Sequence, residues 1–174
     1  HEIKKQLSVM TIVKRVEMPT IFFFLGILSA VAALQSAGQL TVLAGWLDEH
    51  LKSMYLIDLA IGILSAVVDN VPLVAGAMGM YPIEDAAHIA TLVDPTAIAY
   101  AENFVQDGLF WEFLAYCAGT GGSILIIGSA AGVAAMGMER IDFIWYLRKI
   151  SWLAVIGYFA GIATYYLLMG GTVG

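Results

Sequence analysis

The sequence has 174 residues, of which 60% are hydrophobic and only 13% are charged, and its net charge is −6 at pH 7. An average soluble domain has roughly 25% charged residues, and the mean hydropathy here is +0.84. This composition excludes a soluble protein and indicates an integral membrane protein of the all-α class. Nucleic acid is excluded as a partner, because no Lys or Arg occurs between Ser53 and Glu139 to neutralise phosphates. The single cysteine, Cys117, excludes an intramolecular disulfide.

The first half of the chain is predicted to hold one membrane span and one broken apolar segment. It begins without Met and without a signal-peptide pattern, so we expect a piece of a longer protein, with residues 1–17 as a cytoplasmic lead-in. Residues 18–38 are apolar and long enough to cross the hydrocarbon layer. Residues 39–52 have apolar side chains at helical spacing and end in charged ones, which predicts an interfacial amphipathic helix. Residues 55–80 are apolar but are interrupted by Val68-Asp69-Asn70-Val71-Pro72.

The second half is predicted to hold a loop, a second broken segment and a final span. Residues 81–108 are polar and acidic, and we expect a loop with short surface helices. Residues 109–138 are apolar, with glycine-rich interruptions at 119–123 and 128–132. Residues 139–149 form an amphipathic cytoplasmic connector, and residues 150–169 form an uninterrupted apolar span.

The positions of the cations decide the predicted topology. Seven of the eight cations fall into two clusters, one before the first span and one before the last: Lys4, Lys5, Lys14 and Arg15, then Arg140, Arg148 and Lys149. Short loops rich in Lys and Arg stay in the cytoplasm. If residues 55–80 crossed the membrane, the second cluster would lie outside. If they dip in and return, both clusters are cytoplasmic and the acidic loop is external. The sequence therefore favours a re-entrant hairpin with its polar tip near the bilayer midplane.

The tip of this hairpin is the first candidate ion site. Ser65 lies one helical turn before Asp69 and Asn70, so its hydroxyl is expected to approach their side chains. Hydroxyl, amide and carboxylate oxygens suit a hard cation such as Na⁺. Pro72 is expected to start the return arm and to leave one carbonyl free. A desolvated carboxyl favours its protonated form, so the same site could take Na⁺ or H⁺. The alternative is that Asp69 caps the return helix, and capping and binding are compatible.

The second interruption is the other candidate ion site. Thr120 and Ser123 add hydroxyl groups, and the glycines between them allow exposed carbonyls. Unwound stretches between half-helices hold Na⁺ in transporters. The alternative is that the small residues here form a helix-packing face. The sequence leaves these two interpretations of Thr120 and Ser123 open.

Two motifs carry a resemblance to a known family. They are Ser65-Ala66-Val67-Val68-Asp69-Asn70-Val71-Pro72 and Gly119-Thr120-Gly121-Gly122-Ser123, the second followed by Gly128-Ser129-Ala130-Ala131-Gly132. With these motifs the chain resembles NhaD-type sodium/proton antiporters of the ion transporter superfamily. The resemblance implies one half of an inverted-repeat transporter, here the C-terminal repeat, with a re-entrant hairpin and a discontinuous helix. It also implies that Ser65, Asp69, Asn70, Thr120 and Ser123 help to bind the cation.

The resemblance further implies exchange of Na⁺ for H⁺ by elevator-like alternating access, with an N-terminal repeat and a second copy as partners. We expect Na⁺, with Li⁺ as a second candidate ion, in the bacterial inner membrane. No nucleophile with a base and no cofactor motif is visible, so neither an enzyme nor a bound cofactor is expected. One alternative is a dicarboxylate or arsenite carrier of the same superfamily, although Asp69 would repel the negative charge of such a substrate. The other is a membrane subunit that only packs against other helices and transports nothing.

Overall fold

A computed structural model describes residues 18–169 of the chain. The predicted lead-in, residues 1–17, lies outside the described residues. Within them the fold is entirely helical apart from one isolated bridge between Glu84 and Val105, which confirms the all-α prediction.

The chain starts with two helices that meet at a sharp bend. Helix α3 spans Met18–Ser36 and α4 spans Gln39–Leu51, and their axes are bent by 75° at the break. Gly38 stands in the break with φ of 72°, a left-handed conformation that glycine adopts without a steric penalty. The interfacial location predicted for residues 39–52 stays a prediction.

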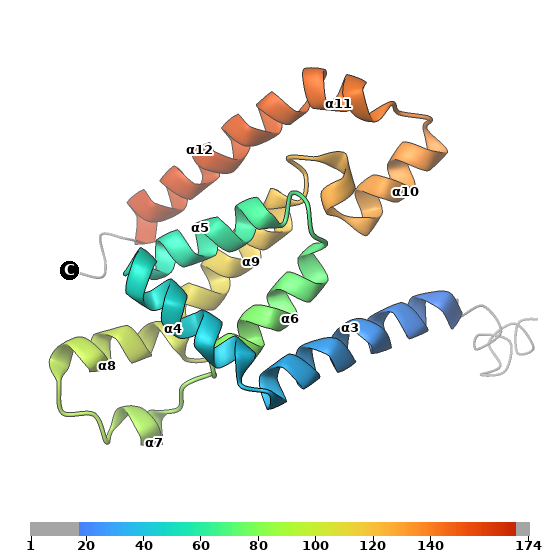
Figure 1. The fold of residues 1–174 in the computed structure, drawn as a ribbon. Coiled ribbons are helices and arrows are strands. Elements are labelled where there is room, and N and C mark those ends of the chain that lie inside the picture. The colour runs from blue at the N-terminus through green and yellow to red at the C-terminus, as the bar shows by residue number, and fades with distance from the viewer. Residues whose placement is uncertain (1–17, 170–174) are drawn as a thin grey trace, which may run out of the picture.

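The first broken segment forms two short helices. Helix α5 spans Met54–Leu64 and α6 spans Asn70–Met80. In Figure 1, α6 returns from the connecting loop toward the side of the molecule where α5 begins. The return helix starts at Asn70, two residues before the predicted start at Pro72. The difference arises because Asp69 caps the helix and a proline is tolerated in the first turn.

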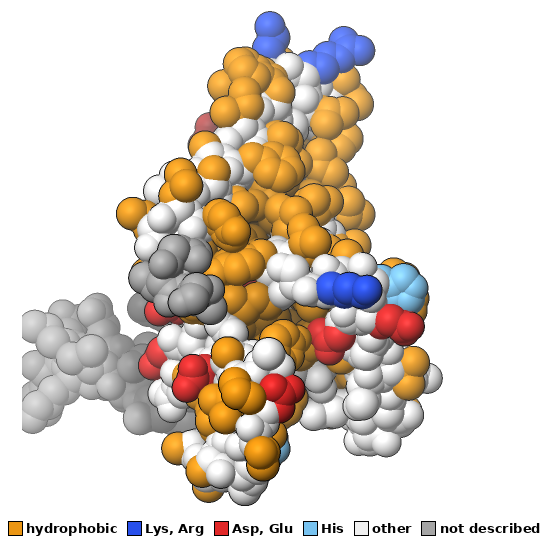
Figure 2. All heavy atoms as spheres, turned by 90° about the vertical axis from the view of Figure 1, so that its left-hand side faces the viewer, with side chains coloured by type: hydrophobic (Ala, Val, Ile, Leu, Met, Phe, Trp, Pro, Cys, Tyr) orange, Lys and Arg blue, Asp and Glu red, His pale blue; other side chains and the backbone are white. Residues whose placement is uncertain are grey.

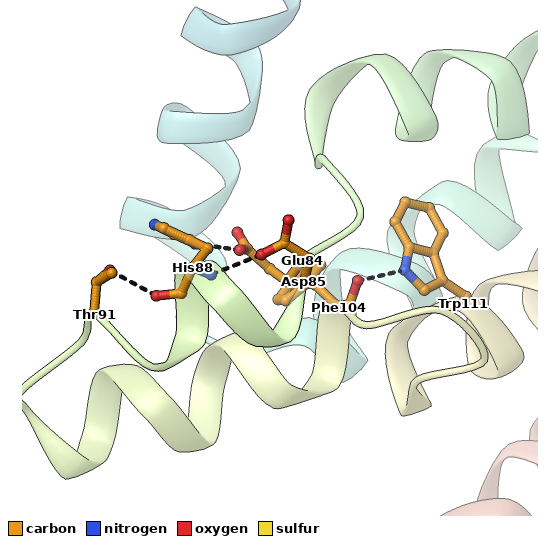
Figure 3. Close-up of polar contacts among 6 residues, drawn as sticks. All are labelled: Glu84, Asp85, His88, Thr91, Phe104 and Trp111. Carbon is orange, nitrogen blue, oxygen red and sulfur yellow. Dashed lines mark hydrogen bonds and ion pairs between the residues drawn. The ribbon is translucent and has the colours of Figure 1, made fainter.

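Short helices shape the acidic segment, residues 81–108. They are α7 (Ala86–Ile89), α8 (Pro95–Ala101) and the 3₁₀ helix η1 (Glu102–Phe104). Figure 3 shows how local contacts hold this segment: the Asp85 carboxylate accepts the His88 amide at 2.6 Å, and the Thr91 hydroxyl donates to the His88 carbonyl at 2.6 Å. The Trp111 indole donates to the Phe104 carbonyl at 3.0 Å and ties the segment to the next helix.

The second broken segment contains one break, where the sequence predicted two. Helix α9 spans Leu109–Gly121, the 3₁₀ helix η2 spans Ile126–Gly128, and α10 spans Ala130–Met138. The glycines at 119 and 121 continue α9, and Gly121 packs there directly against the Gly62 backbone of α5. Ser129 caps α10 by accepting the Gly132 amide at 3.0 Å, so Gly132 lies inside that helix.

Two further helices complete the described chain: α11 (Phe143–Lys149) and α12 (Ser151–Met169). Among the described residues, α12 is the one unbent helix long and apolar enough to cross a membrane, and the bent α3–α4 pair would count as a second span. Figure 2 shows Lys and Arg side chains at the top of a largely apolar surface, while most Asp and Glu side chains lie lower down, where a further Lys or Arg side chain and a His side chain lie among them.

The core forms where α5 and α9 lie side by side (Figure 1), the most extensive helix pairing in the fold. Tyr55 contacts Phe113 near the start of both helices, and Ser65 contacts Ala118 near their ends, so the two helices run parallel. Aromatic and aliphatic side chains from α4, α6 and η1 close one side of this pair, and Tyr158 of α12 closes the other.

Candidate ion-binding site where two helix breaks meet

The two broken segments approach each other through glycines. A Cβ atom on Gly121 of α9 would collide with the Gly62 carbonyl of α5. A Cβ atom on Gly62 would in turn lie 2.7 Å from the Cys117 carbonyl oxygen. The backbones of α5 and α9 therefore touch directly, and the breaks that follow each helix are brought to the same place.

Backbone carbonyls gather at this meeting point around Gly128. A Cβ atom on Gly128 would lie 2.5 Å from the Ser65 carbonyl oxygen, 2.6 Å from that of Ala66 and 2.7 Å from that of Gly122. Within the described part of the chain, no backbone N–H donates a hydrogen bond to these three oxygens. Two of the carbonyls come from the first break and one from the second, so both breaks contribute oxygens to one small region.

The predicted residues of the first break have separate local contacts. Ser65 is fully buried, and its hydroxyl donates to the Ala118 carbonyl of α9 at 2.7 Å. Asp69 is half-buried and accepts the Val71 amide at 3.0 Å, which confirms the capping role considered from the sequence. Asn70 is the first residue of α6. Among residues 18–169 no hydrogen bond joins the Ser65 hydroxyl to the Asp69 or Asn70 side chain, so the three predicted donors do not converge directly.

The predicted residues of the second break also make backbone contacts. The Thr120 hydroxyl donates to the Tyr116 carbonyl one turn earlier at 2.6 Å, and the exposed Ser123 hydroxyl donates to the Thr120 carbonyl at 2.6 Å. The Ser123 carbonyl accepts the Tyr146 hydroxyl of α11 at 2.8 Å. These contacts hold the end of α9, and no hydrogen bond in the described residues links either hydroxyl to those of the first break.

The chemistry of the region is that of oxygen donors with one carboxylate nearby. Hydroxyl and carbonyl oxygens are ligands for hard cations without redox chemistry. No cluster of three or more His, Cys, Asp or Glu side chains suited to a transition metal exists within the described residues. Oxygen donors gathered at interrupted helices are of the chemical kind that suits a small hard cation.

One buried carboxylate, Asp58, is absent from the predicted set. It lies in the middle of α5, is 0% exposed, and neither carboxyl oxygen has a hydrogen-bond partner among the described residues. A signal for it was present in the sequence, since an ionisable residue within an apolar run has a functional role by default. Asp58 lies away from the interruption at residues 68–72, so the pattern of helix breaks does not mark it.

A surface cavity of about 240 Å³ lies where α4, α8 and the end of α6 meet. Asp48 lines it and accepts hydrogen bonds from the hydroxyls of Tyr81 at 3.1 Å and Tyr100 at 3.2 Å. Burial, followed by the negative charge of Asp48, raises the pKa of both phenols well above their ordinary value. This shift favours the neutral phenols, which donate their hydroxyls to Asp48.

Comparison with known proteins identifies relatives of the chain. Residues 3–101 match the CitMHS family, described as citrate transporter. The chain is 47% identical over 162 residues to sodium/proton antiporter 1 of Arabidopsis thaliana, covering 93% of this chain and 25% of that protein. It is 32% identical over 155 residues to the Na⁺/H⁺ antiporter NhaD of Alkalimonas amylolytica, covering 88% of this chain and 27% of that protein. No solved structure matches the chain.

The chain thus spans about a quarter of the length of these two curated relatives. The matched family and the named relatives are transporters, in agreement with the expectation that the chain is not an enzyme. The resemblance to NhaD-type antiporters is confirmed, and the assignment to a C-terminal repeat stays a prediction. The chain belongs to the CitMHS family of membrane transporters and is of the NhaD antiporter type.

Proposed function

We propose that the chain forms part of a transporter that exchanges Na⁺ for H⁺. The observation that carries this proposal is the meeting of two helix breaks around Gly128, where carbonyls of Ser65, Ala66 and Gly122 lie close together. The relatives named as sodium/proton antiporters match nearly the whole chain, and this supports Na⁺ and H⁺ as the two exchanged ions. Na⁺ is a transported substrate in this proposal, so no resident cofactor is needed.

The proposed site combines these carbonyls with the polar side chains of both breaks. Ser65, Asp69 and Asn70 come from the first break, and Thr120 and Ser123 from the second. Asp69 supplies the negative charge, and its single hydrogen bond to the Val71 amide leaves lone pairs for a cation. Small rotations of the serine and threonine hydroxyls would turn their oxygens toward the same ion, because hydroxyls both donate and accept.

We further propose that α5 and α6 form the re-entrant hairpin of one half of an inverted-repeat transporter. Each helix has 11 residues, or about 16 Å at 1.5 Å per residue, roughly half of the ~30 Å hydrocarbon layer. Alternating access, an N-terminal repeat and a homodimer belong to the same proposal. The bacterial inner membrane stays our prediction for its location, and relatives come from both plants and bacteria.

The experiment that tests the exchange uses everted vesicles carrying the full-length parent protein. Wild type is compared with Asp69→Asn and Asn70→Ala, and Na⁺-induced proton movement is followed across alkaline pH. Asparagine caps a helix as well as aspartate does, so Asp69→Asn removes the charge and keeps the cap. Exchange is expected to fall to background in Asp69→Asn. The matched control is Asp142→Asn, since Asp142 caps the surface helix α11 by accepting the Trp145 amide at 2.9 Å.

An anion carrier is the alternative, because the matched family is described as citrate transporter. Asp69 and the absence of Lys and Arg between Ser53 and Glu139 oppose it, since a carboxylate substrate would meet like charge without compensation. Uptake of labelled citrate or a dicarboxylate by the parent, with no Na⁺-induced proton movement, would favour the carrier. Normal exchange in Asp69→Asn would remove the hairpin tip from the mechanism.

A further inference from the structure

Asp58 is a buried carboxyl group without a structural purpose in the fold. Buried polar groups in proteins almost always have hydrogen-bond partners, yet both Asp58 oxygens lack one within residues 18–169. Its side chain is 0% exposed, so the rest of the transporter cannot reach it in this conformation. It caps no helix, because it lies in the fifth position of α5. A residue this costly to bury is retained for a function.

The surroundings of Asp58 favour a proton over a metal ion. The groups that interact electrostatically with it are neutral hydroxyls and one thiol: Cys117 of α9, Tyr158 and Tyr165 of α12, Tyr81 after α6, and Tyr100 of α8. No Lys, Arg or His of the described chain is among them. The backbone on both sides is regular helix, whose carbonyls are occupied by helical hydrogen bonds. A sodium ion at Asp58 would therefore lack the ring of oxygen ligands that the helix breaks provide.

We propose that Asp58 binds and releases the exchanged proton, while Na⁺ is held separately at the helix breaks. This inference rests on the proposed Na⁺/H⁺ exchange and divides its two ions between two sites on α5. The buried, unpartnered position of Asp58 favours its neutral acid form, and ionisation requires the loss of one proton from this carboxyl. The proton that leaves Asp58 passes to water, which carries it away as hydronium.

The cavity beside Asp48 provides the exit. Tyr81 is 6% exposed, lines this cavity, donates its hydroxyl to Asp48 and interacts electrostatically with Asp58. Tyr100 of α8 is 45% exposed, lines the same cavity, donates its hydroxyl to Asp48 and also interacts electrostatically with Asp58. These two phenols line the cavity and interact with the buried acid, so the exit for the proton is assigned to this side of the molecule.

The distance between the two sites explains how the ions can be coupled. Ser65 follows Asp58 by seven residues of helix, roughly 10 Å at 1.5 Å per residue. At an effective dielectric constant of about 20, one positive charge at that distance weakens proton binding by roughly tenfold. Binding of Na⁺ at the breaks would therefore release the Asp58 proton, and protonation would weaken Na⁺ binding equally.

Infrared difference spectroscopy of the full-length parent in liposomes tests the inference. The carbonyl stretch of a protonated carboxylic acid is recorded while the pH is raised without Na⁺, and again when NaCl replaces choline chloride at fixed alkaline pH. We expect both steps to reduce an acid band in wild type and in the control Asp94→Asn, whose carboxyl is exposed. The band should be missing in Asp58→Asn, and exchange in everted vesicles should fall to background.

Asparagine has the shape and hydrogen-bonding capacity of the neutral acid, so a merely structural Asp58 would tolerate this change. Normal exchange with an unaltered pH profile in Asp58→Asn would overturn the inference. If Asp58→Asn fails to insert into the membrane, Asp58→Glu is used in its place. An acid band with the same frequency in Asp58→Glu and in wild type would overturn the assignment of that band to Asp58. Absence of Na⁺-driven proton movement in wild type would instead refute the proposed exchange, while the Na⁺-free pH titration still decides whether Asp58 titrates.

Discussion

Carboxylates in two regions of this molecule differ in their exposure and in their hydrogen bonding. In the acidic segment, residues 81–108, they lie at the surface and accept hydrogen bonds from nearby groups, as Asp85 does from the His88 amide (Figure 3). At the α5–α9 interface, Asp58 is fully buried and has no partner within the described chain. The first group stabilises local turns and helix starts. Asp58 has no hydrogen bond within the described chain that would offset the cost of its burial, which favours a functional role for it.

Asp69 lies between these extremes. It accepts a backbone amide as a helix cap, like the surface carboxylates, but it does so in the helix break whose Ser65 and Ala66 carbonyls lie close to Gly128. A cap and an ion ligand are compatible roles for one carboxylate, because the cap occupies one of about four lone-pair sites. The comparison therefore separates three kinds of carboxyl group: capped at the surface, capped at a break, and buried without a cap.

The close contact of α5 and α9 gives the largest expected change in stability. Gly121→Ala places a methyl group against the Gly62 backbone, whereas Gly119→Ala on the same helix meets nothing within 4 Å. Overpacking of this kind costs about 1–3 kcal/mol. We expect a lower melting temperature for Gly121→Ala in the purified parent, measured by tryptophan fluorescence, and little change for Gly119→Ala. Equal melting temperatures would show that the backbones do not touch as described.

The buried Ser65 hydroxyl should contribute less to the free energy of unfolding than the close contact at Gly121 does. Ser65→Ala removes its hydrogen bond to the Ala118 carbonyl, and a typical buried hydrogen bond contributes about 1 kcal/mol. Ser123→Ala is the matched control, because its hydroxyl is exposed and its replacement should change stability by less than about 0.5 kcal/mol. Both are measured by denaturant unfolding of the parent. A larger loss of stability in Ser123→Ala than in Ser65→Ala would show that the buried hydroxyl does not make the more stabilising hydrogen bond.

The main features of the fold could be predicted from the sequence, because apolar run lengths and glycine or proline interruptions are strong local signals. Residues 39–52 and 150–169 correspond closely to α4 and α12. The exact ends of the breaks could not be predicted. Glycines at 119 and 121 read as breaks in the sequence, yet both continue α9. Gly121 lies against the Gly62 backbone of α5, a helix that ends 45 residues before α9 begins, so this contact is not visible in the local sequence.

The candidate site was only partly predictable for the same reason. The Ser65, Asp69 and Asn70 spacing suggested side chains that converge, but the Ser65 hydroxyl is instead engaged by Ala118, a contact between residues 53 positions apart. Backbone carbonyls around Gly128 carry no signal in the sequence, since every residue has one. Asp58 could have been noticed as an acid in an apolar run, but its missing partners are visible only once the neighbouring helices are in place.

The smallest expected effect concerns Asp94, the surface counterpart of Asp58. Hydrogen bonds from the Thr96 hydroxyl at 2.7 Å and the Thr96 amide at 3.0 Å lower the pKa of Asp94 below its ordinary value of 3.8. Folding lowers the pKa of Asp94, so the ionised carboxylate stabilises the start of α8. This stabilisation is complete at pH values above the pKa of Asp94 in the unfolded chain, and it is lost as the pH falls through the pKa in the folded chain. The protection of the Thr96 amide against hydrogen exchange, measured relative to the intrinsic rate at each pH, should therefore fall only in that acidic range. Thr96→Val removes the hydroxyl donor and should raise the Asp94 pKa, and an unchanged titration in Thr96→Val would show that the hydroxyl does not stabilise the carboxylate.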